Sequence, residues 1–411
     1  MALIVAKFGG TSVGDIDRIK NAASKVAQEI RRGNKVVVVV SAMAGVTDQM
    51  IGYCHSVTPH PNPRELDAVI ATGEQVSSGL MALALEQRGI NARSWQGWQV
   101  QVRTDRDHTK ARILEIEAAR LKERIEKGEV PVLAGFQGVA EDGSITTLGR
   151  GGSDTSAVAL AAALGADRCD IYTDVDGVYT SDPRIVTKAS KLSRISYEEM
   201  LELASLGAKV LQTRSVEMAL RYHMPIQVLS TFENAIGSDL PGTLVTEEDE
   251  TMENNPVTGI AHSLGDAKIT LADVKDSPGV AASIFAPLAQ AGINVGVIVQ
   301  TASKDGKTTT VTFSVPRDML KRAEQIIKAD QEKIGYHEMV SDTDIAKISL
   351  VGLGMRNRPG IAALMFKTLA DKGVNIKLIE TSEINISVLI DQEYLELALR
   401  ALHTAFELDA E

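Results

Sequence analysis

The sequence predicts an α/β sandwich with a mainly parallel sheet, followed by two smaller ferredoxin-like units of the βαββαβ type. Three observations carry this prediction. Short apolar runs alternate with helix-length segments over the first 245 residues, an acidic break follows them, and a repeated segment fills the remainder. With 411 residues, the chain is long enough for two or three domains.

The apolar runs of the first part lack the alternation of a half-exposed strand. LIVAKF (3–8) and KVVVVVS (35–41) are continuous, which is typical of strands covered on both faces. A helix-length stretch, Ile16 to Arg32, lies between them. One or two of the runs could be turns of buried helix without changing the class. Further strand candidates are 130–136, 169–175 and 225–230, and further helix candidates are 153–166 and 196–223.

The second part begins after EEDETMENNP (247–256), whose five carboxylates predict a linker. Beyond it, residues 276–301 align with 357–382 at a constant offset of 81. Both copies contain a Pro-Gly pair at the start of a helix-length segment and an asparagine after it. Two related domains are therefore expected.

The two repeats differ in how they end. The first continues with a helix (318–329) and a strand (336–341), whereas the second ends after its helix (392–406) and lacks a last strand. The unassigned strand 257–264 is expected to complete the second repeat, which makes the first an insertion within it. The expected domains are 1–246, the linker 247–256, 266–342 for the first repeat, and 257–264 plus 343–411 for the second.

Composition argues against several classes of function. The net charge of −11 without a basic run argues against nucleic acid as a partner. Two cysteines, Cys54 and Cys169, make neither a disulfide framework nor a metal-ligand pattern. No signal peptide is recognisable, and no apolar segment is expected to reach the ~20 residues that span a bilayer. A cytoplasmic protein without a membrane partner is expected.

The stretch KFGGTS, Lys7 to Ser12, is the first chemical signal. A strand ends there and glycines follow, where backbone N–H groups approach an anion without a Cβ in the way. Thr11 and Ser12 add donors, and Lys7 places a positive charge at the sheet edge where ligands of open α/β sheets bind. The alternative is a glycine turn with a solvated lysine. The stretch is not a Walker loop, because the lysine precedes the glycines.

Two further segments carry candidate chemistry. In LGRGGSDTSA (148–157), an arginine between glycines has room to fork around a carboxylate or phosphate. Ser153 and Asp154 open a helix there, so the alternative for them is a helix cap. TDVDGVYTSDPR (173–184) follows a strand end as a long polar loop, for which ordinary turns are the alternative.

Together these segments resemble the aspartokinases, a family of the amino acid kinase superfamily. KFGGTS, SAMAGVTD (41–48), ATGEQVSS (71–78), LGRGGSDTSA and TDVDGVYTSDPR stand in the order of that family. The C-terminal repeats resemble tandem ACT domains, its amino-acid-sensing modules. The resemblance covers essentially the whole chain.

The resemblance implies phosphorylation of the L-aspartate side chain by ATP to 4-phospho-L-aspartate, the first step towards lysine, threonine and methionine. A carboxylate with a pKa of ~3.9 is already ionised at neutral pH, so this nucleophile needs no general base. Catalysis then consists of holding two anions together and stabilising charge on the transferring phosphoryl group. Mg²⁺ is expected on the ATP phosphates, without a metal site made by the protein.

The resemblance also assigns residues. Arg150 is expected to clamp the α-carboxylate of aspartate, and Glu74 and Asp154 to favour its ammonium group. For Glu74 alone, a solvated carboxylate in a first helical turn is the alternative. The catalytic residues implied are Lys7 and Asp154, the substrate-binding residues Ser41, Thr47, Glu74, Arg150, Gly152 and Ser153, and the ATP-binding residues Lys7, Phe8, Gly9, Gly10, Thr173, Asp174, Tyr179, Asp182, Arg184, Lys209 and Val210.

For the tail, the resemblance implies lysine or threonine, or both, as effectors bound where ACT units of two chains meet, in a homodimer or larger assembly. The Pro-Gly turns alone are also consistent with simple helix starts. Met252 could begin a free regulatory chain. The implied effector contacts are Asp276, Pro278, Gly279, Val280, Asn294, Gln300, Asn375, Ile376 and Thr381.

Two other readings remain open. One is another enzyme of the superfamily, such as an acetylglutamate, glutamate or uridylate kinase, against which KFGGTS and the ACT pair argue. The other is a catalytically silent amino-acid-binding regulator, against which the presence of Lys7, Arg150 and Asp154 argues.

Overall fold

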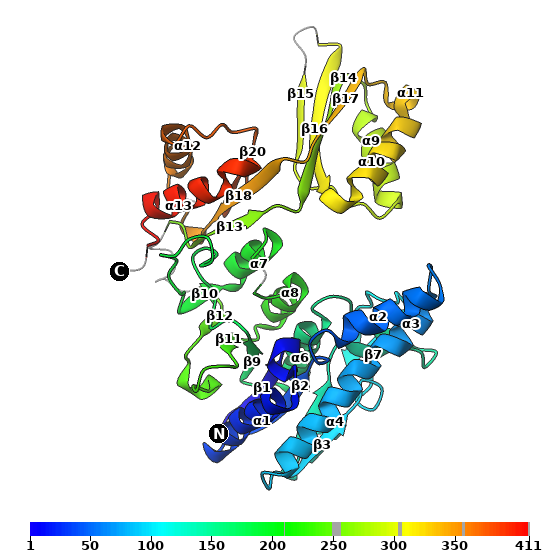
Figure 1. Ribbon diagram of the computed structural model, residues 1–411, viewed down its shortest axis with the longest axis vertical. Coiled ribbons are helices and arrows are strands. Elements are labelled where there is room, and N and C mark those ends of the chain that lie inside the picture. The colour runs from blue at the N-terminus through cyan, green and yellow to red at the C-terminus, as the bar shows by residue number, and fades with distance from the viewer. Residues whose placement is uncertain (209, 249–255, 303–305, 356–357, 410–411) are drawn as a thin grey trace. The chain divides into compact units, whose positions relative to one another are not determined.

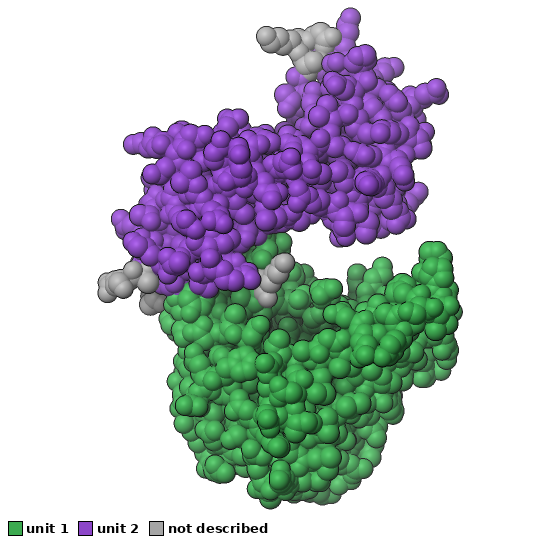
Figure 2. All heavy atoms as spheres, viewed as in Figure 1, with its two compact units in different colours: residues 1–179, 191–252 green, residues 180–190, 253–411 purple. Residues whose placement is uncertain are grey.

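The computed structural model describes residues 1–208, 210–248, 256–302, 306–355 and 358–409. The chain forms two compact units (Figure 2). Residues 1–179 and 191–252 form the first unit, and residues 180–190 and 253–411 form the second. The sequence placed 180–190 with the first domain, whereas the structure packs it within the second unit.

The first unit contains a mostly parallel sheet of eight strands in its described part, which confirms the predicted fold class (Figure 1). β1 and β9 lie side by side at its centre, and β12 is antiparallel to β11. In order across the sheet the strands are β10 (Arg194–Ser196), β12 (Thr243–Thr246), β11 (Ile226–Ser230), β9 (Arg168–Thr173), β1 (Leu3–Phe8), β2 (Lys35–Val40), β6 (Val130–Ala134) and β3 (Ala92–Trp95).

Helices cover both faces of this sheet, which is why its strands are continuous apolar runs. Ala6 and Phe8 of β1 belong to an apolar cluster with α1 and α4. Because side chains alternate along a strand, Lys7 faces the opposite side, where α6 packs. The helices of this unit are α1 (Ile16–Arg31), α2 (Val46–Val57), α3 (Pro63–Ile70), α4 (Thr72–Glu86), α5 (Ala119–Glu126), α6 (Gly152–Leu164), α7 (Tyr197–Ser205), α8 (Thr213–Tyr222) and the 3₁₀ turns η1 (Gly10–Val13) and η2 (Gly237–Asp239).

The first unit also contains a second, smaller sheet, two of whose strands follow β6 in the chain. It leads into the glycine-rich segment at 148–152. Its strands, in order of pairing over the described residues, are β5 (Ile113–Ile116), β4 (Val102–Thr104), β7 (Gln137–Val139) and β8 (Ile145–Thr147).

Two expectations for the first unit are wrong. The segment 196–223 is not one helix, because α7 starts at a Ser196–Glu199 capping box and ends before Gly207, whose φ of 122° is left-handed. In addition, Pro63–Glu86 is 24 residues long and apolar enough, by length and composition, to cross a membrane. Here its α4 part packs against α1, β3 and β6, so we interpret it as a core segment.

The second unit contains two four-stranded antiparallel sheets within its described residues, each with its own helices (Figure 1). The first repeat orders its strands β15 (Ile298–Ala302), β16 (Thr308–Pro316), β14 (Asp266–Lys275) and β17 (Glu338–Asp342). Its helices are α9 (Val280–Gln290), η4 (Arg317–Met319), α10 (Leu320–Ala329) and α11 (Gln331–Ile334). Ile284, Leu288 and Phe313 lie in its apolar core.

The second repeat takes its last strand from upstream of the first repeat. β13 (Gly259–Ser263) pairs antiparallel with β18, in the place that β17 has beside β14. The strand order is β13, β18 (Ile345–Val351), β20 (Asn385–Asp391) and β19 (Leu378–Thr381). The helical segments are η5 (Leu353–Met355), α12 (Ile361–Asp371), η6 (Gln392–Tyr394) and α13 (Leu395–Ala405).

The segment 180–190 is anchored to the second repeat by side chains of α13 and the residues after it. His403 is fully buried, and its Nε2 lies 2.8 Å from Thr180 Oγ1. Arg400 Nε donates to Ile185 O at 3.0 Å, and Ser190 Oγ donates to Leu408 O at 3.0 Å. These bonds place the segment within the second unit.

Replacing Ala261 by proline should lower the local stability of the second repeat and leave that of the first unchanged. Ile260 N donates to Thr180 O, so the N–H of Ala261 faces β18, where it pairs opposite Ser349. Proline lacks this donor, and we expect a loss of ~1–3 kcal/mol in the local stability of the sheet. Hydrogen exchange should become faster in β18 and β20 but not in β14 and β16. Ala261→Gly, which keeps the N–H, is the control; unchanged protection of β18 in the proline variant would contradict the pairing.

Candidate active site

The carboxyl ends of the central strands meet at one edge of the large sheet. Phe8 is in register with Val40 of β2 and with Tyr172 of β9, and Thr173 is in register with Ser230 of β11. The segments that follow these strands therefore start at the same level. The structure thus brings together the predicted residues Lys7, Ser41 and Thr173, at the edge where open α/β sheets bind ligands.

Lys7 forms an ion pair with Asp154 across this edge. Lys7 Nζ lies 2.5 Å from Asp154 Oδ1, and only about a tenth of each side chain is exposed, 9% and 11%. Asp154 stands in the first turn of α6, where the helix dipole stabilises a negative charge. The alternative of a solvated lysine is therefore wrong.

The Gly9-Gly10 turn after Lys7 is closely packed. A Cβ on Gly9 would stand 3.4 Å from Lys7 Nζ, and one on Gly10 would stand 3.1 Å from Ala42 O. Gly9 N donates to Tyr172 O at 3.1 Å, so in this structure Gly9 does not present its N–H to a ligand. Gly10 is the remaining candidate donor of the pair.

Two other residues of KFGGTS support the core. The Phe8 ring is buried and stacks on Tyr172 with centroids 4.7 Å apart. The hydroxyl of Ser12 lies 2.6 Å from Thr231 Oγ1 and is fully buried. The expectation that Ser12 donates to a phosphate is therefore wrong, because its hydroxyl ties η1 to the end of β11.

Arg150 is presented by a loop that only glycines allow. Gly149 and Gly151 have left-handed φ values of 78° and 72°. A Cβ on Gly151 would stand 1.8 Å from Gln212 Cγ, so a side chain there is excluded. Within the described part of the chain, the exposed Arg150 guanidinium has no hydrogen-bond or ion-pair partner. The loop therefore leaves this fork free to bind an anion.

The helix-cap alternative for Ser153 and Asp154 does not hold. The N-cap of α6 is Gly151, and no side chain caps the helix. Gly152, Ser153 and Asp154 are buried in the first turn, next to the ion pair with Lys7. They are therefore placed with the predicted site and not as capping groups.

The carboxyl group of Glu74 is buried, and only one of its two oxygens has a hydrogen-bond partner among the described residues. Its Oε1 accepts a hydrogen bond from Ala42 N at 2.9 Å, whereas its buried Oε2 has no partner among the described residues. Only 3% of the residue is exposed, and this burial raises the pKa of the Glu74 carboxyl to about 7. A ligand cation at Oε2 would satisfy the oxygen and favour the ionised form. The alternative of a solvated carboxylate is wrong.

Ser41 and Thr47 lie on the segment that Glu74 holds. Ser41 N donates to Phe8 O at 3.1 Å, and Ser41 O accepts from Ser77 Oγ at 2.7 Å. Thr47 stands in the first turn of α2 and is partly exposed. These bonds attach the end of β2 both to β1 and to α4.

The predicted nucleotide residues divide into two groups. In the first unit, Thr173 Oγ1 donates to Asp174 Oδ1 at 3.1 Å, and Tyr179 donates from its hydroxyl to Asp176 at 3.0 Å. Val210 lies in a turn between α7 and α8. Lys209 is outside the described residues.

Asp182 and Arg184 belong to the second unit and pair with each other. The Arg184 guanidinium binds both oxygens of Asp182, with Nε to Oδ1 at 3.0 Å and Nη2 to Oδ2 at 2.7 Å. Arg184 N also donates to Asp182 Oδ1, which is the turn geometry that the sequence left as an alternative. The Arg184 side chain is 86% exposed, whereas that of Asp182 is 16% exposed, so only the arginine of the pair is open to solvent.

Most of the predicted effector residues of the two repeats are exposed. Gly279 has a φ of 94° and is the N-cap of α9, so the Pro-Gly turn starts a helix, as Gly360 does for α12. Val280 is buried in the core, and Ile376 is partly buried. The exposed members are Asp276, Pro278, Gly279, Asn294, Gln300, Asn375 and Thr381.

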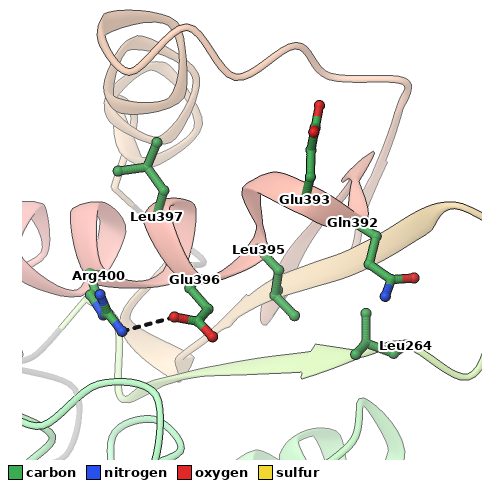
Figure 3. Close-up of a pocket in the computed structure, with 7 residues that line it drawn as sticks. All are labelled: Leu264, Gln392, Glu393, Leu395, Glu396, Leu397 and Arg400. Carbon is green, nitrogen blue, oxygen red and sulfur yellow. Dashed lines mark hydrogen bonds and ion pairs between the residues drawn. The ribbon is translucent and has the colours of Figure 1, made fainter.

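A shallow surface pocket of the second repeat lies apart from all of these residues (Figure 3). It has a volume of about 510 Å³ and lies between α13 and Leu264. Its charged groups include Glu396 and Arg400, which pair with each other at 2.9 Å. Figure 3 shows Leu395 and Gln392 pointing towards Leu264. The charged groups Glu396 and Arg400 of this pocket neutralise each other, and none of the predicted site residues lines it. We therefore assign the pocket no part in the reaction.

The described residues contain no group of three or more His, Cys, Asp or Glu side chains placed to hold a metal ion. At this edge Lys7 supplies a cation and Gly10 a candidate backbone donor, and both suit the phosphates of a nucleotide.

The sequence interpretation missed a buried residue, Asp67, that supports the loops of the site through hydrogen bonds. Asp67 of α3 is fully buried and accepts hydrogen bonds from Thr109 and Thr147. In the sequence it is a single carboxylate in an amphipathic helix, which gives no signal of a partner 80 residues away.

The comparisons with known proteins cover the entire chain. The amino acid kinase family model matches residues 2–230, and ACT domain models match residues 268–331 and 348–406. An aspartate kinase of Stutzerimonas stutzeri is 53% identical over 411 residues, which cover 100% of this chain and 98% of that protein. An aspartokinase of Mycolicibacterium smegmatis is 47% identical, with 99% of this chain and 97% of that protein covered.

Solved structures agree with this assignment. E. coli aspartokinase III in complex with aspartate and ADP is 26% identical, with a TM-score of 0.82 over 98% of this chain and 99% of that chain. The same enzyme in complex with lysine and aspartate has a TM-score of 0.76. The kinase unit carries the Lys7–Asp154 pair, and two ACT domains follow it along the chain. Together with the full-length relatives, these features show that this chain belongs to the aspartokinase family of amino acid kinases.

Proposed function

We propose that this protein transfers the γ-phosphoryl group of ATP to the side-chain carboxylate of L-aspartate, giving 4-phospho-L-aspartate. The observation that supports this most directly is the Lys7–Asp154 ion pair at the carboxyl edge of the sheet. The relative with bound aspartate and ADP supports the choice of substrates.

Lys7 would hold the phosphates and stabilise the charge on the transferring group. A lysine that is paired on one side and reaches a glycine turn on the other is already oriented, so little reorganisation is needed during the reaction. The attacking carboxylate is ionised without help from a base. The residues at this edge therefore position and neutralise two anions, which is the main task in phosphoryl transfer.

The two ends of aspartate would be held by groups of opposite charge. Arg150 would bind the α-carboxylate through its planar fork, and Glu74 Oε2 would accept from the α-ammonium group. Ser41, Thr47 and Ser153 would complete this site. The nucleotide would contact Lys7, Gly10 and the residues from Thr173 to Tyr179.

We also propose feedback regulation through the ACT domains by lysine, threonine or both, at the start of the pathway to lysine, threonine and methionine in the cytoplasm. The E. coli relative with lysine bound supports lysine. Titrating the kinase assay with each amino acid, separately and together, distinguishes these effectors.

Assembly into a dimer or larger oligomer is supported by the edges of the two repeats. β15 and β19 are edge strands, and they expose Ile298 (52%) and Ile379 (45%) at matching positions of the repeat. An edge strand offers unpaired backbone groups to a second copy of the chain, and the exposed isoleucine on each strand adds apolar surface. A free regulatory chain beginning at Met252, outside the described residues, stays a prediction.

The first test replaces Lys7 by alanine. We expect kcat with aspartate to fall at least ~100-fold, which is typical for the loss of one preorganised electrostatic group. A coupled ADP-release assay with aspartate, glutamate and N-acetylglutamate measures both the loss and the choice of acceptor. The Lys7→Ala Asp154→Asn double variant, which removes the unpaired carboxylate, should regain thermal stability but no activity. A near-normal kcat in Lys7→Ala would refute this role.

The second test replaces Arg150 by lysine, which keeps the charge but loses the planar fork. The KM for aspartate should rise about 10-fold or more, since a charge-assisted hydrogen bond contributes about 1.5–3 kcal/mol. The KM for ATP should change little. Equal small changes for both substrates would show that Arg150 acts only in the structure.

The third test uses the pH dependence of substrate capture. With a pKa of about 7, the Glu74 carboxyl of the free enzyme becomes protonated as the pH falls through neutrality. Because only the carboxylate attracts the ammonium group, kcat/KM for aspartate should fall about tenfold per pH unit below that value. Glu74→Gln should have a low kcat/KM without this dependence. An unchanged profile in Glu74→Gln would assign the titration to another group.

A further inference from the structure

The loop that carries Arg150 is held in place by a buried carboxylate behind it. Asp67 of α3 is 0% exposed. Its oxygens accept hydrogen bonds from Thr109 N (3.1 and 3.0 Å), Thr147 N (3.1 Å) and Thr147 Oγ1 (2.6 Å), and His108 Nδ1 lies 2.8 Å from Oδ2. One side chain therefore joins three segments of the first unit.

Two of these segments border the arginine loop. Thr147 is the last residue of β8, and Arg150 follows three residues later. Thr109 O lies 2.9 Å from the position of a Cβ on Gly149, so the backbone at Thr109 packs directly on the loop. The position of Arg150 therefore depends on how Thr109 and Thr147 are held.

Thr109 also has a backbone conformation that requires support. Its φ of 69° lies in the left-handed region, which is unfavourable for a β-branched residue. Both oxygens of Asp67 accept from its N–H, which fixes the peptide in this conformation. Strained residues of this kind persist only where the surroundings determine them, and they are concentrated at binding sites.

We propose that Asp67 is a positioning residue for aspartate binding: through Thr109 and Thr147 it fixes the Gly149–Gly151 loop, so that Arg150 meets the substrate carboxylate in a single orientation. This inference rests on the proposed role of Arg150. Asp67 does not touch the substrate. Its contribution is the preorganisation of the loop, which lowers the entropic cost of binding.

An asparagine at position 67 is a sharp test, because it has nearly the same shape. Thr109 N donates to both oxygens of Asp67, and Thr147 N also donates to Oδ2, so the amide NH₂ of an asparagine faces a backbone donor in either orientation. Backbone N–H groups cannot become acceptors. At least one contact of the cluster must therefore break, even though no cavity is made.

The matched control is Glu29→Gln. Glu29 of α1 is also buried, and it accepts from Ser238 N (2.7 Å), Ser238 Oγ (2.5 Å) and Asn34 Nδ2 (2.8 Å). Asn34 directly precedes β2, so this network lies at the amino edge of the sheet, opposite to the site. The control breaks a comparable network without touching the arginine loop.

The experiment compares the full-length wild type with Asp67→Asn, Glu29→Gln, Thr147→Val and Thr147→Ser. Hydrogen exchange of the ligand-free proteins follows peptides that cover 145–155, and steady-state kinetics gives KM for both substrates. We expect faster exchange in Asp67→Asn and Thr147→Val, and a KM for aspartate raised on the order of tenfold, with KM for ATP unchanged. Thr147→Ser, which keeps the hydroxyl, should restore wild-type behaviour, and Glu29→Gln should change neither quantity.

Exchange of 145–155 that stays at the wild-type rate in Asp67→Asn would overturn the proposal, whatever the enzyme phosphorylates. Equal increases of both KM values in Asp67→Asn and Glu29→Gln would also overturn it, because they would indicate a general loss of stability. If Asp67→Asn loosens the loop while Arg150→Lys leaves KM for aspartate unchanged, the proposed role of Arg150 fails, and with it the link from Asp67 to binding.

Discussion

The first unit depends on one ion pair that the alternation of a strand makes possible. Phe8 faces the apolar layer with α1 and α4, so Lys7 must face the other layer, where α6 begins with Asp154. A lysine in this position would be costly without a partner, because burial penalises an unpaired charge. The pair therefore fixes the first turn of α6 against the end of β1 and places a cation where a phosphate would lie.

The polar groups of this site fall into two classes: some have hydrogen-bond partners within the protein, and others have none among the described residues. Ser12, Asp67 and the backbone of Ser41 use their hydrogen bonds to tie neighbouring segments together. Arg150 and Glu74 Oε2, in contrast, have no partner among the described residues. An unsatisfied buried oxygen is unfavourable in the free protein, so a ligand that supplies the missing donor gains that energy on binding.

The second unit shows how chain order and spatial order can differ. β13 precedes the first repeat in the sequence but pairs with β18 in the sheet of the second repeat. The whole first repeat therefore lies, along the chain, between two paired strands of the second. The segment 180–190 joins the same unit, through His403, Arg400 and Leu408. That segment follows Thr173 to Tyr179 in the chain and itself contains the predicted nucleotide residues Asp182 and Arg184.

Apolar periodicity, glycine turns and motif order can be read directly along the chain, so the fold class, most strands and helices, and the family were predictable from the sequence. The sequence also pointed to Lys7, Asp154 and Arg150 as site residues. The three-dimensional contacts were needed to show which groups already have a hydrogen-bond partner: the Gly9 N–H bonds to Tyr172, the Ser12 hydroxyl to Thr231, and Asp182 to Arg184. The tertiary structure likewise divided 196–223 into two helices and showed that Asp67 supports the arginine loop. Most of these contacts join residues far apart in sequence, and the pKa of Glu74 depends on burial, so they leave no local pattern in the sequence. The Asp182–Arg184 contact is local, and the sequence allowed for it as a turn.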